Sequence, residues 1–505
     1  MTVKRQKKER KPLIINAFAM LTPILQSNTF AVPENQAHLY NSLDYWIELA
    51  KLLEKGKFNA LFLADVLGPY DVYKSGGTPN NSNLGPVALS GAQWPINEPS
   101  AYISAMAAVT KNLSFAITFA TISEAPYHFA RRLATLDHLT KGRIGWNIVS
   151  SYLNTACKNL LNGEPLPDHD VRYDKTQEYL EIVYQLFLSS WADDAVKLDK
   201  IKRVYTDPEK IREINFEGEH YKVPGPFICE PNPYQRIPAI LQAGASTKGL
   251  EFAAKNAESI FINGTTPQGL KSKVDKLTTL LEKYGRKRED VKLVQLATII
   301  TAPTHEEAIA KLEHYKKYTD LDGAQALFGG WTGIDLDNYD YEEELDQVES
   351  NAVRSMAEMM TKPFPGDPPN LKKTRKYIAE KLAIGGSGIV FVGTPQEIAD
   401  EIEEFIDIST IDGFNFCYAV MPGSFENIVN LIIPELQKRG LVWKDYPKTE
   451  NLTFRENIFG LGDGTFDPTY LKPNHPAYNL RWLEGESKEE FEKKFERTLK
   501  ENFSK

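Results

Sequence analysis

The sequence is poor in the residue types that build disulfide frameworks and metal sites. Its 505 residues include only 3 cysteines and 8 histidines. Cys157, Cys229 and Cys417 are odd in number and widely spaced, which excludes a disulfide framework and a zinc-finger pattern. No HExxH, CxxC or GxSxG pattern occurs, and the histidines lack tight ligand spacing. We therefore expect no bound metal and no activated serine nucleophile.

Long apolar runs and a positive net charge are also missing. No apolar run reaches the roughly 18–20 residues of a membrane span, and none follows the basic N-terminus as it would in a signal peptide. The formal net charge of −9 argues against nucleic acid as a main partner. We expect a cytoplasmic protein that binds neither nucleic acid nor membrane, with residues 1–12 as a disordered basic tail.

What the sequence does contain is a regular alternation of short apolar runs and amphipathic helical patterns, one of which predicts a continuous helix over 34–57. Most of the runs are continuously apolar, which is typical of strands buried on both faces of a parallel sheet. The eight runs are 13–18, 60–65, 114–121, 144–150, 237–244, 259–264, 292–301 and 413–421. Eight strands alternating with helices predict a (β/α)8 TIM barrel. A ninth run, 388–393, is interpreted as a short extra segment; a doubly wound sheet is the alternative, but no GxGxxG follows the first strand.

The spacing of the strands is uneven. Long insertions at about 66–100, 151–236 and 302–387 each follow the C-terminal end of a predicted strand. Active sites of such barrels lie at that face, and insertions of this length inside a compact domain are commonly lids. We expect a barrel over residues 13–445 with these insertions, followed by a C-terminal extension at 446–505 that wraps the barrel or a neighbouring subunit.

Polar residues stand where several strands end. Asp65 closes the second strand, Thr118 lies near the end of the third, and Asn147 lies inside the fourth, in the segment GRIGWNIVSSYLN. Burying an amide without a partner costs roughly 1–3 kcal/mol, so this polar group indicates a ligand site. For Asp65, a helix cap or a structural ion pair is an equally good interpretation.

Two further segments suit an anion. The fifth strand ends in QAGAST and a helix follows, so Ser246 and free backbone N–H groups would stand at a helix N-terminus. An ordinary capped helix start has the same sequence pattern. His169 and Tyr173 are one helical turn apart and can face one ligand, although a lone histidine is more often structural. A barrel with polar strand ends but no metal or nucleophile pattern suggests that a cofactor supplies the chemistry.

Five motifs, taken together and in this order, resemble a known family. They are FLAD (62–65), GRIGWNIVSS (142–151), HDVRYDKTQEYL (169–180), QAGAS (242–246) and GTPQEIAD (393–400). The chain is similar over about residues 13–445 to the bacterial-luciferase-like flavin monooxygenases, in particular to the nitrilotriacetate monooxygenase component A and dibenzothiophene-sulfone monooxygenase group.

The resemblance implies a (β/α)8 barrel that receives reduced FMN from a separate NAD(P)H:flavin reductase. With O2 it would oxygenate a small organic substrate, with possible C–S or C–N cleavage, as a homodimer or homotetramer. It implies that Asp65 binds the isoalloxazine ring, that Thr118 lies on the strand beside the ring and that Asn147 lies on the strand beneath it. His169 and Tyr173 would contact the ribityl chain and phosphate. Ala245, through its backbone, and Ser246 would bind the phosphate. No residue is singled out as catalytic.

Two departures from the family pattern stand out. The family often has Gly-Ser-Ser where this chain has Gly244-Ala245-Ser246, so one hydroxyl is absent, and Ser150 replaces a threonine. Two other functions remain open from the residues. One is a metal- or acid/base-dependent barrel hydrolase that uses Asp65 with His128 or His169. The other is a non-catalytic flavin-binding protein on the same barrel.

Overall fold

The computed structural model describes residues 11–76, 82–244, 246–345, 352–461 and 466–503. The tail predicted for residues 1–12 lies outside the described residues except for Lys11 and Pro12. Among the described helices, none has both the length and the apolar character needed to cross a bilayer.

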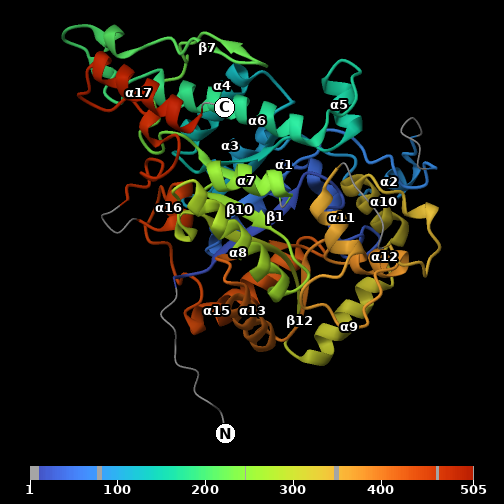
Figure 1. Ribbon diagram of the computed structural model, residues 1–505. Coiled ribbons are helices and arrows are strands. Elements are labelled where there is room, and N and C mark those ends of the chain that lie inside the picture. The colour runs from blue at the N-terminus through green and yellow to red at the C-terminus, as the bar shows by residue number, and fades with distance from the viewer. Residues whose placement is uncertain (1–10, 77–81, 245, 346–351, 462–465, 504–505) are drawn as a thin grey trace.

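Eight parallel strands close into a barrel, as the alternation of patterns predicts (Figure 1). In barrel order they are β1 (Ile14–Met20), β2 (Ala60–Ala64), β3 (Ser114–Ala120), β4 (Ile144–Val149), β9 (Ala239–Ala243), β10 (Ser259–Ile262), β11 (Lys292–Thr301) and β13 (Gly413–Cys417). The pairing of β13 with β1 completes the cylinder. The predicted (β/α)8 fold class is confirmed.

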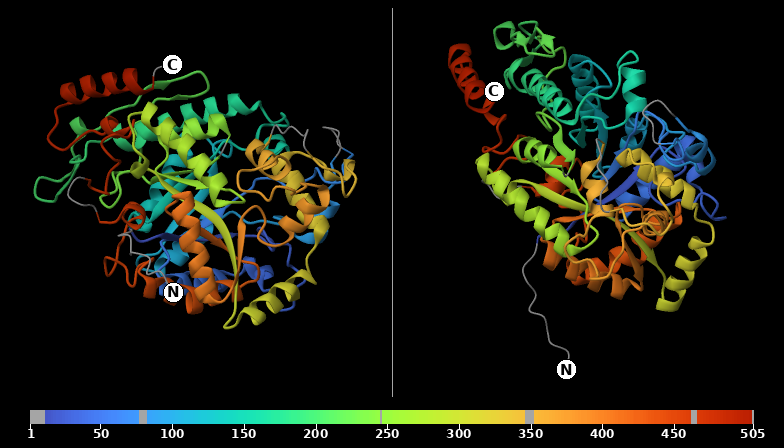
Figure 2. Two further views of the ribbon diagram at one scale, coloured as in Figure 1. Left: turned by 60° about the horizontal axis from the view of Figure 1, so that its bottom comes forward. Right: turned by 45° about the vertical axis from the view of Figure 1, so that its right-hand side comes forward.

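The ninth run forms a strand outside the cylinder, β12 (Ile389–Gly393). It pairs with β11 from Ala297 to Thr301, whereas β13 pairs with β11 from Val294 to Thr298. Strand β11 has ten residues, so its far end projects beyond the barrel and offers β12 an edge. Figure 2 shows the long yellow β11 with the orange β12 beside it. The interpretation of this run as a short extra segment is therefore correct.

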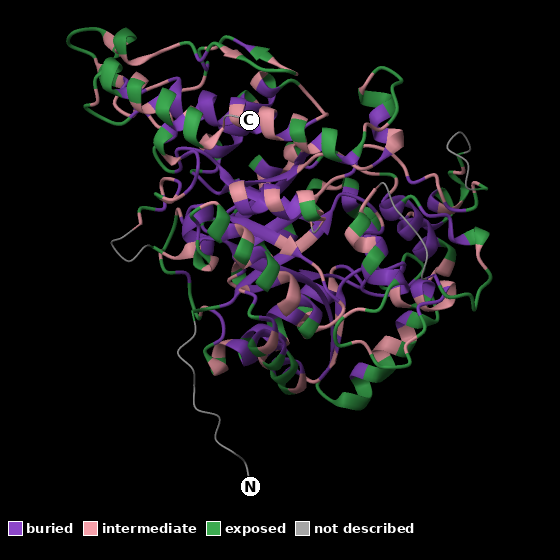
Figure 3. Ribbon diagram, in the orientation of Figure 1, coloured by how far each residue is buried: buried purple, intermediate pink, exposed green. Residues whose placement is uncertain are grey.

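Helices surround the strands, and Figure 3 shows the buried residues concentrated on the strands and on the inner sides of these helices. The outer ring contains α1 (Leu43–Lys55), α3 (Ser100–Ala108), α4 (Pro126–Leu139), α6 (His169–Ser189), α7 (Thr247–Asn256), α8 (Pro267–Lys283), α13 (Pro395–Ser409) and α15 (Ile433–Arg439). The continuous helix predicted over 34–57 is wrong at its start. A 3-10 helix, Ala37–Asn41, comes first, and the extended backbone of Ser42 separates it from α1.

The long insertions contain their own secondary structure. The first holds α2 (Gly85–Ser90), and the second holds α5 (Asn154–Leu160) and the hairpins β5–β6 (Val196–Asp199, Val204–Thr206) and β7–β8 (Phe216–Glu217, Lys222–Val223). The third holds α9 (His305–Lys316), α10 (Leu321–Thr332), α11 (Arg354–Thr361) and α12 (Arg375–Ala383). Helix α6 of the second insertion packs against α4 and α7 and so serves as a barrel helix.

The C-terminal segment closes the N-terminal end of the barrel. In it, α16 (Phe454–Phe459) inserts Phe454 and Ile458 among residues that begin the strands, including Ile14, Ala60 and Ala239. At Gly145 a Cβ atom would lie 2.8 Å from the Phe454 ring, so the strand admits the helix only because this residue is glycine.

Two polar anchors hold α16 in place. The side chain of Arg455 is completely buried and donates to both carboxylate oxygens of Glu258, at 2.7 and 3.0 Å, and to the Ile237 carbonyl at 2.7 Å. Asn457 donates to the Asn112 carbonyl at 2.8 Å and to the Ser114 hydroxyl at 2.7 Å.

The last helix, α17 (Lys488–Asn502), lies on the outside, beside the second insertion (Figure 1). Its apolar face meets Arg212, whose guanidinium lies 4.6 Å from the centre of the Phe495 ring. The last sixty residues thus contact both the inside and the outside of the barrel.

Removing the Arg455 guanidinium should destabilise the protein strongly. Arg455→Ala leaves the Glu258 carboxylate buried without its partner, which costs about 3–5 kcal/mol. The measurement is the shift in denaturant midpoint followed by tryptophan fluorescence. Lys316→Ala is the control. The side chains of Lys316 and its partner Glu313 are 54% and 56% exposed, and such a surface pair contributes less than about 1 kcal/mol to stability. Equal shifts for the two variants would contradict the anchoring role of Arg455.

Candidate active site

The polar residues that end neighbouring strands meet at one cavity, hereafter the ring cavity, of about 260 Å³ at the C-terminal face of the barrel. Asp65, Thr118 and Asn147 all line it. Most of its remaining wall is apolar and comes from strands and insertions, with Met20, Leu25, Phe62, Val66, Phe261, Leu296, Trp331, Met356 and Met359 among the lining residues.

Three stacked phenylalanines form the floor of the ring cavity. Phe62 lies between Phe18 and Phe261, with ring centroids 5.0 and 4.0 Å apart and the planes within 23° of parallel. All three rings line the ring cavity and also pack against the cluster that contains Phe454 of α16. The barrel interior is therefore filled below the cavity and open above it.

Asn147 presents a hydrogen-bond acceptor to the ring cavity. Its amide nitrogen donates to the Thr118 hydroxyl at 2.9 Å across the paired strands β3 and β4. Its Oδ1 is buried and has no partner among the described residues. A buried acceptor without a partner is costly, so a ligand that donates a hydrogen bond here would repay that cost.

Asp65 contributes a carboxyl group to the same cavity. Burial, with the nearby charge of Glu98, raises the pKa of Asp65 to about 8, although the Val66 backbone N–H opposes the shift. The carboxyl group is therefore protonated at neutral pH and acts as a hydrogen-bond donor. The wall thus offers one donor, Asp65, and one acceptor, Asn147.

A smaller pocket of about 70 Å³, hereafter the anion pocket, adjoins the ring cavity. The two share Val149, Tyr152, Gly244, Val353 and Ser355 in their walls. His169, Tyr173 and Ser246 line the anion pocket, as predicted from the spacing of HDVRY and the QAGAS turn. Ala245, the other residue predicted there, lies outside the described residues.

The side chains of the anion pocket are held in place by one another. The Ser246 hydroxyl lies 3.2 Å from Nε2 of His169 and accepts the Gly249 N–H at 3.1 Å, which makes it the N-cap of α7. Nδ1 of His169 lies 2.7 Å from the Asp170 carboxylate, and this contact orients the ring. Hydroxyl, imidazole and the N-terminus of a ten-residue helix converge on one point, an arrangement suited to a phosphate group.

Two glycines let the anion pocket form. A Cβ atom at Gly244 would lie 2.9 Å from the Tyr173 hydroxyl oxygen, and one at Gly249 would lie 2.8 Å from it. Tyr173 is partly buried, and the loss of solvent raises the pKa of its phenol, although hydrogen bonds with Ser246, Ser150 and Gln242 act in the other direction. Its hydroxyl therefore remains protonated and can donate to a ligand.

Sequence reasoning missed several residues that line these pockets. Arg354 of α11 lines the anion pocket, and Lys273 of α8 and Gln93 line the ring cavity. They come from insertions or from the side of a helix, where no short motif marks them. One signal for Gln93 was available in the sequence, because it follows Gly91 in a Gly- and Pro-rich loop. In the structure its φ is 50°, a strained conformation that often marks functional loops.

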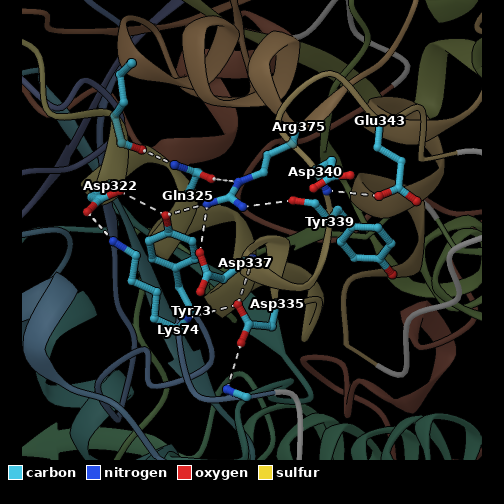
Figure 4. Close-up of polar contacts among 12 residues, drawn as sticks. Tyr73, Lys74, Asp322, Gln325, Asp335, Asp337, Tyr339, Asp340, Glu343 and Arg375 are labelled. Carbon is cyan, nitrogen blue, oxygen red and sulfur yellow. Dashed lines mark hydrogen bonds and ion pairs between the residues drawn. The ribbon is translucent and has the colours of Figure 1, made fainter.

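The first and third insertions are tied together beside the ring cavity by a polar network, hereafter the clasp, shown in Figure 4. Arg375 donates to the Asp337 carboxylate at 2.9 Å, to the Tyr73 hydroxyl at 3.2 Å and to Gln325 at 2.7 Å. Asp322 accepts from Tyr73 at 2.9 Å and from Lys74 at 2.6 Å. The contacts of Tyr73 and Lys74 with Asp322 and Arg375 join residues about 250–300 positions apart in the sequence.

Aromatic residues extend the clasp to the cavity wall. The Tyr70 hydroxyl lies 2.7 Å from both the Tyr152 hydroxyl and Gln93 Oε1, which joins the first insertion to the end of β4. A Cβ atom at Gly330 would lie 2.0 Å from the Tyr70 ring, so α10 packs directly on this tyrosine. Trp331 follows on α10 and lines the cavity. The insertions therefore form a fixed roof.

The histidines proposed for a hydrolase are not gathered at one place. His169 lines the anion pocket while Asp65 lines the ring cavity. His128 lies on α4, where its side chain is 61% exposed and 3.5 Å from Glu124. Within the described ranges, no group of three or more His, Cys, Asp or Glu side chains could hold a metal ion. This geometry does not assemble the acid/base or metal constellation that such a hydrolase needs.

Comparisons with known proteins agree with this geometry. Residues 19–410 match the family described as luciferase-like monooxygenase. The chain is 44% identical to dimethyl-sulfide monooxygenase of Hyphomicrobium sulfonivorans, over 94% of each chain. It is also 44% identical to long-chain alkane monooxygenase of Geobacillus thermodenitrificans, over 90% of this chain and 95% of that one.

The group predicted from the motifs also appears among the relatives. Nitrilotriacetate monooxygenase component A of Aminobacter aminovorans is 32% identical over 84% of this chain and 92% of its own length. Among solved structures, a riboflavin lyase described with modified FMN and riboflavin superposes with a TM-score of 0.84 at 30% identity, over 93% of this chain and 100% of that chain.

Replacing Asp65 should make the protein's stability less sensitive to pH. The pKa of Asp65 rises from 3.8 to about 8 on folding, so its protonated form favours the fold below pH 4, and this contribution is lost as the pH rises to 8. Asp65→Asn should therefore be more stable than the parent by an amount that grows with pH, to about 2–3 kcal/mol at pH 8 after allowance for partial solvent exposure.

The check is the melting temperature of both proteins at intervals from pH 5 to pH 8. Asp44→Asn, which changes an exposed carboxylate on α1, serves as the control and should show no growing difference. A constant offset between Asp65→Asn and the parent over this range would contradict a protonated Asp65.

Proposed function

Because the chain belongs to the luciferase-like monooxygenase family, we propose that it receives reduced FMN from a separate flavin reductase and uses it with O2 to oxygenate a small, neutral and largely apolar molecule. The chain is an oxidoreductase and its cofactor is reduced FMN. The observation that supports the proposal best is the junction of an apolar, roofed ring cavity with an anion pocket at the same end of the barrel.

The residues present fit FMN. Asn147 offers a buried acceptor without a partner among the described residues, and Asp65 offers a donor, as the N–H and carbonyl groups of an isoalloxazine ring require. Ser246, Tyr173 and His169 offer donors for the phosphate at the start of α7. Bound reduced FMN supplies the electrons with which O2 is activated.

The protein's own contribution is to bind, orient and exclude water. The stacked rings of Phe18, Phe62 and Phe261 provide a flat apolar floor, and the Asn147–Thr118 hydrogen bond fixes the acceptor that faces the cavity. Trp331 lines the cavity, and Tyr70 and the clasp hold the insertions beside it, so this roof would limit the access of water and the loss of activated oxygen. Asp65 holds a proton on its carboxyl group at neutral pH.

The wall of the ring cavity favours a neutral substrate. Among the described residues, the only acidic or basic side chains in that wall are Asp65, which is protonated and neutral, and Lys273, whose Nζ donates to the Asn263 carbonyl at 2.6 Å. A polycarboxylate would need several cations to offset its desolvation. The two relatives at 44% identity are named for dimethyl sulfide and for long-chain alkanes, both of them neutral. We place thioethers, with oxygenation leading to C–S cleavage, first among the candidates.

A reconstituted assay tests the proposed function. The purified protein is mixed with a flavin reductase, NADH, FMN and O2, and products from dimethyl sulfide, long-chain alkanes and nitrilotriacetate are identified by mass spectrometry. Product should form only when flavin and reductase are both present, and only from the neutral substrates. Turnover without flavin would overturn the proposal, and faster oxidation of nitrilotriacetate would overturn the substrate class.

The anion pocket should contribute equally to the binding of both redox states of FMN. Ser246→Ala combined with Tyr173→Phe removes two donors to a charged phosphate, each worth roughly 1.5–3 kcal/mol, so Kd should rise by about 100-fold or more. Titration of oxidised FMN in air and of reduced FMN without oxygen measures both values. Ser123→Ala with Tyr127→Phe makes the same chemical changes outside the pocket and should leave both unchanged. Unaltered affinity in the first double variant would place the phosphate elsewhere.

Opening the clasp should let activated oxygen escape. Arg375→Met removes the bonds to Asp337, Tyr73 and Gln325, so the share of O2 released as hydrogen peroxide should rise at least about twofold. The measurement is the ratio of peroxide to oxygenated product in the coupled assay. Lys376→Met, next to it and paired with Glu342 on the surface, is the control. An unchanged ratio in Arg375→Met would show that the roof closes without the clasp.

A further inference from the structure

Lys273 is the only basic side chain in the wall of the ring cavity, as far as the structure describes the chain. It lies on α8, two turns from the N-terminus of the helix, and its Nζ donates to the Asn263 carbonyl at the end of β10, at 2.6 Å. The same nitrogen lies 5.2 Å from the centre of the Phe364 ring. Both contacts hold the amine at the barrel mouth rather than in solvent.

The amine has no carboxylate within ion-pair distance in the described part of the chain. Its neighbours differ in this respect, because Lys248 lies 3.1 Å from Asp174 and Lys373 lies 2.8 Å from Asp367. Glu358 acts on Lys273 only from beyond contact distance, and burial lowers the pKa of Lys273 to about 8. The amine is therefore still charged at neutral pH, in a place where charge is costly.

A cation that is partly buried, held by a carbonyl and a ring, and placed in the wall of a cavity indicates an anionic ligand. A phosphate held within the anion pocket is not that ligand, because Lys273 is absent from the wall of that pocket. A neutral substrate offers no charge either. The remaining candidate is the flavin ring, which is neutral when oxidised and carries a negative charge near neutral pH when reduced.

We propose that Lys273 is the positioning residue that makes this protein prefer reduced over oxidised FMN, by placing a cation beside the ring system that becomes anionic on reduction. The inference rests on the proposed function, because it needs FMN in the ring cavity. It goes further in assigning the selection of the redox state to one side chain. Such selection would let the protein take up reduced flavin from the reductase and release the oxidised form.

The position of Lys273 suits that exchange. A larger open groove, of about 710 Å³, runs between α7, α8 and α11, and its wall includes His169 and Ser246 of the anion pocket as well as Lys273. The groove therefore reaches both binding pockets, and Lys273 stands where it meets the ring cavity. A flavin that moves along the groove would pass this amine before its ring is enclosed.

Three variants test the proposal. Lys273→Met removes the charge but keeps much of the length, Lys273→Arg restores a charge, and Lys276→Met removes an exposed cation that lines the groove but not the ring cavity. Kd is measured for oxidised FMN in air and for reduced FMN without oxygen, and the midpoint potential of the bound flavin is measured independently.

Lys273→Met should raise Kd for reduced FMN by about 10- to 100-fold and change Kd for oxidised FMN less than about threefold. The preference for reduced flavin is the ratio of Kd for oxidised FMN to Kd for reduced FMN. For this two-electron couple, each tenfold fall in that ratio makes the midpoint potential of the bound flavin about 30 mV more negative. Lys273→Arg should recover most of the preference, and Lys276→Met should match the parent.

Three outcomes for Lys273→Met would overturn the inference. Equal weakening of the binding of oxidised and reduced FMN would indicate a purely structural amine, and unchanged affinities for both would show that the amine does not act on the flavin. An effect confined to the KM of the substrate would assign the cation to the substrate. The failure of the parent protein to bind either form of FMN would instead refute the proposed function. The two failures are therefore distinguishable. The Ser246→Ala, Tyr173→Phe variant gives the contrasting pattern, because the phosphate is the same in both redox states.

Discussion

The stack of Phe18, Phe62 and Phe261 across the barrel interior is the constraint on which the rest of the site depends. Phe18 and Phe62 are direct partners on the paired strands β1 and β2, whereas Phe261 comes from β10, and only closure of the cylinder brings it onto Phe62. Below the stack, Phe454 and Ile458 of α16 fill the barrel. Above it, the strands end in polar side chains. The stack thus divides a solid core from a binding cavity.

Two kinds of support hold the cavity. Strand register fixes Asn147 opposite Thr118, and the turn after β9 fixes Ser246 at the start of α7. Both depend on local geometry and backbone hydrogen bonds. The roof depends instead on long-range side-chain contacts, above all those of Arg375 with the first insertion. The floor and the anion pocket are therefore parts of the barrel, whereas the roof is an addition built from insertions. Variation in the roof can alter the substrate without disturbing the cofactor site.

The sequence predicted those features that have a local signature. Continuous apolar runs identified all eight barrel strands, and the strand-end residues Asp65, Thr118 and Asn147 do line one cavity. His169, Tyr173 and Ser246 line a second pocket, and their contact with a cofactor remains a prediction. The assignment to the luciferase-like family is confirmed. Lys273 and Arg354 were not predictable, because a basic residue on an amphipathic helix looks solvated until the helix is docked. The break at Ser42 was missed because apolar spacing continues across it.

The placement of α16 has a consequence for the order of events during synthesis. Translation proceeds from the N-terminus, so all eight barrel strands leave the ribosome before residues 454–459 that fill the barrel's base. Until then Ile14, Ala60 and Ala239 face an empty interior, and Glu258 lacks its buried partner. A nascent chain stopped after β13 is thus a cylinder without a base, with apolar surface available to chaperones. A segment made after every barrel strand is therefore the one that completes the core at the barrel's base.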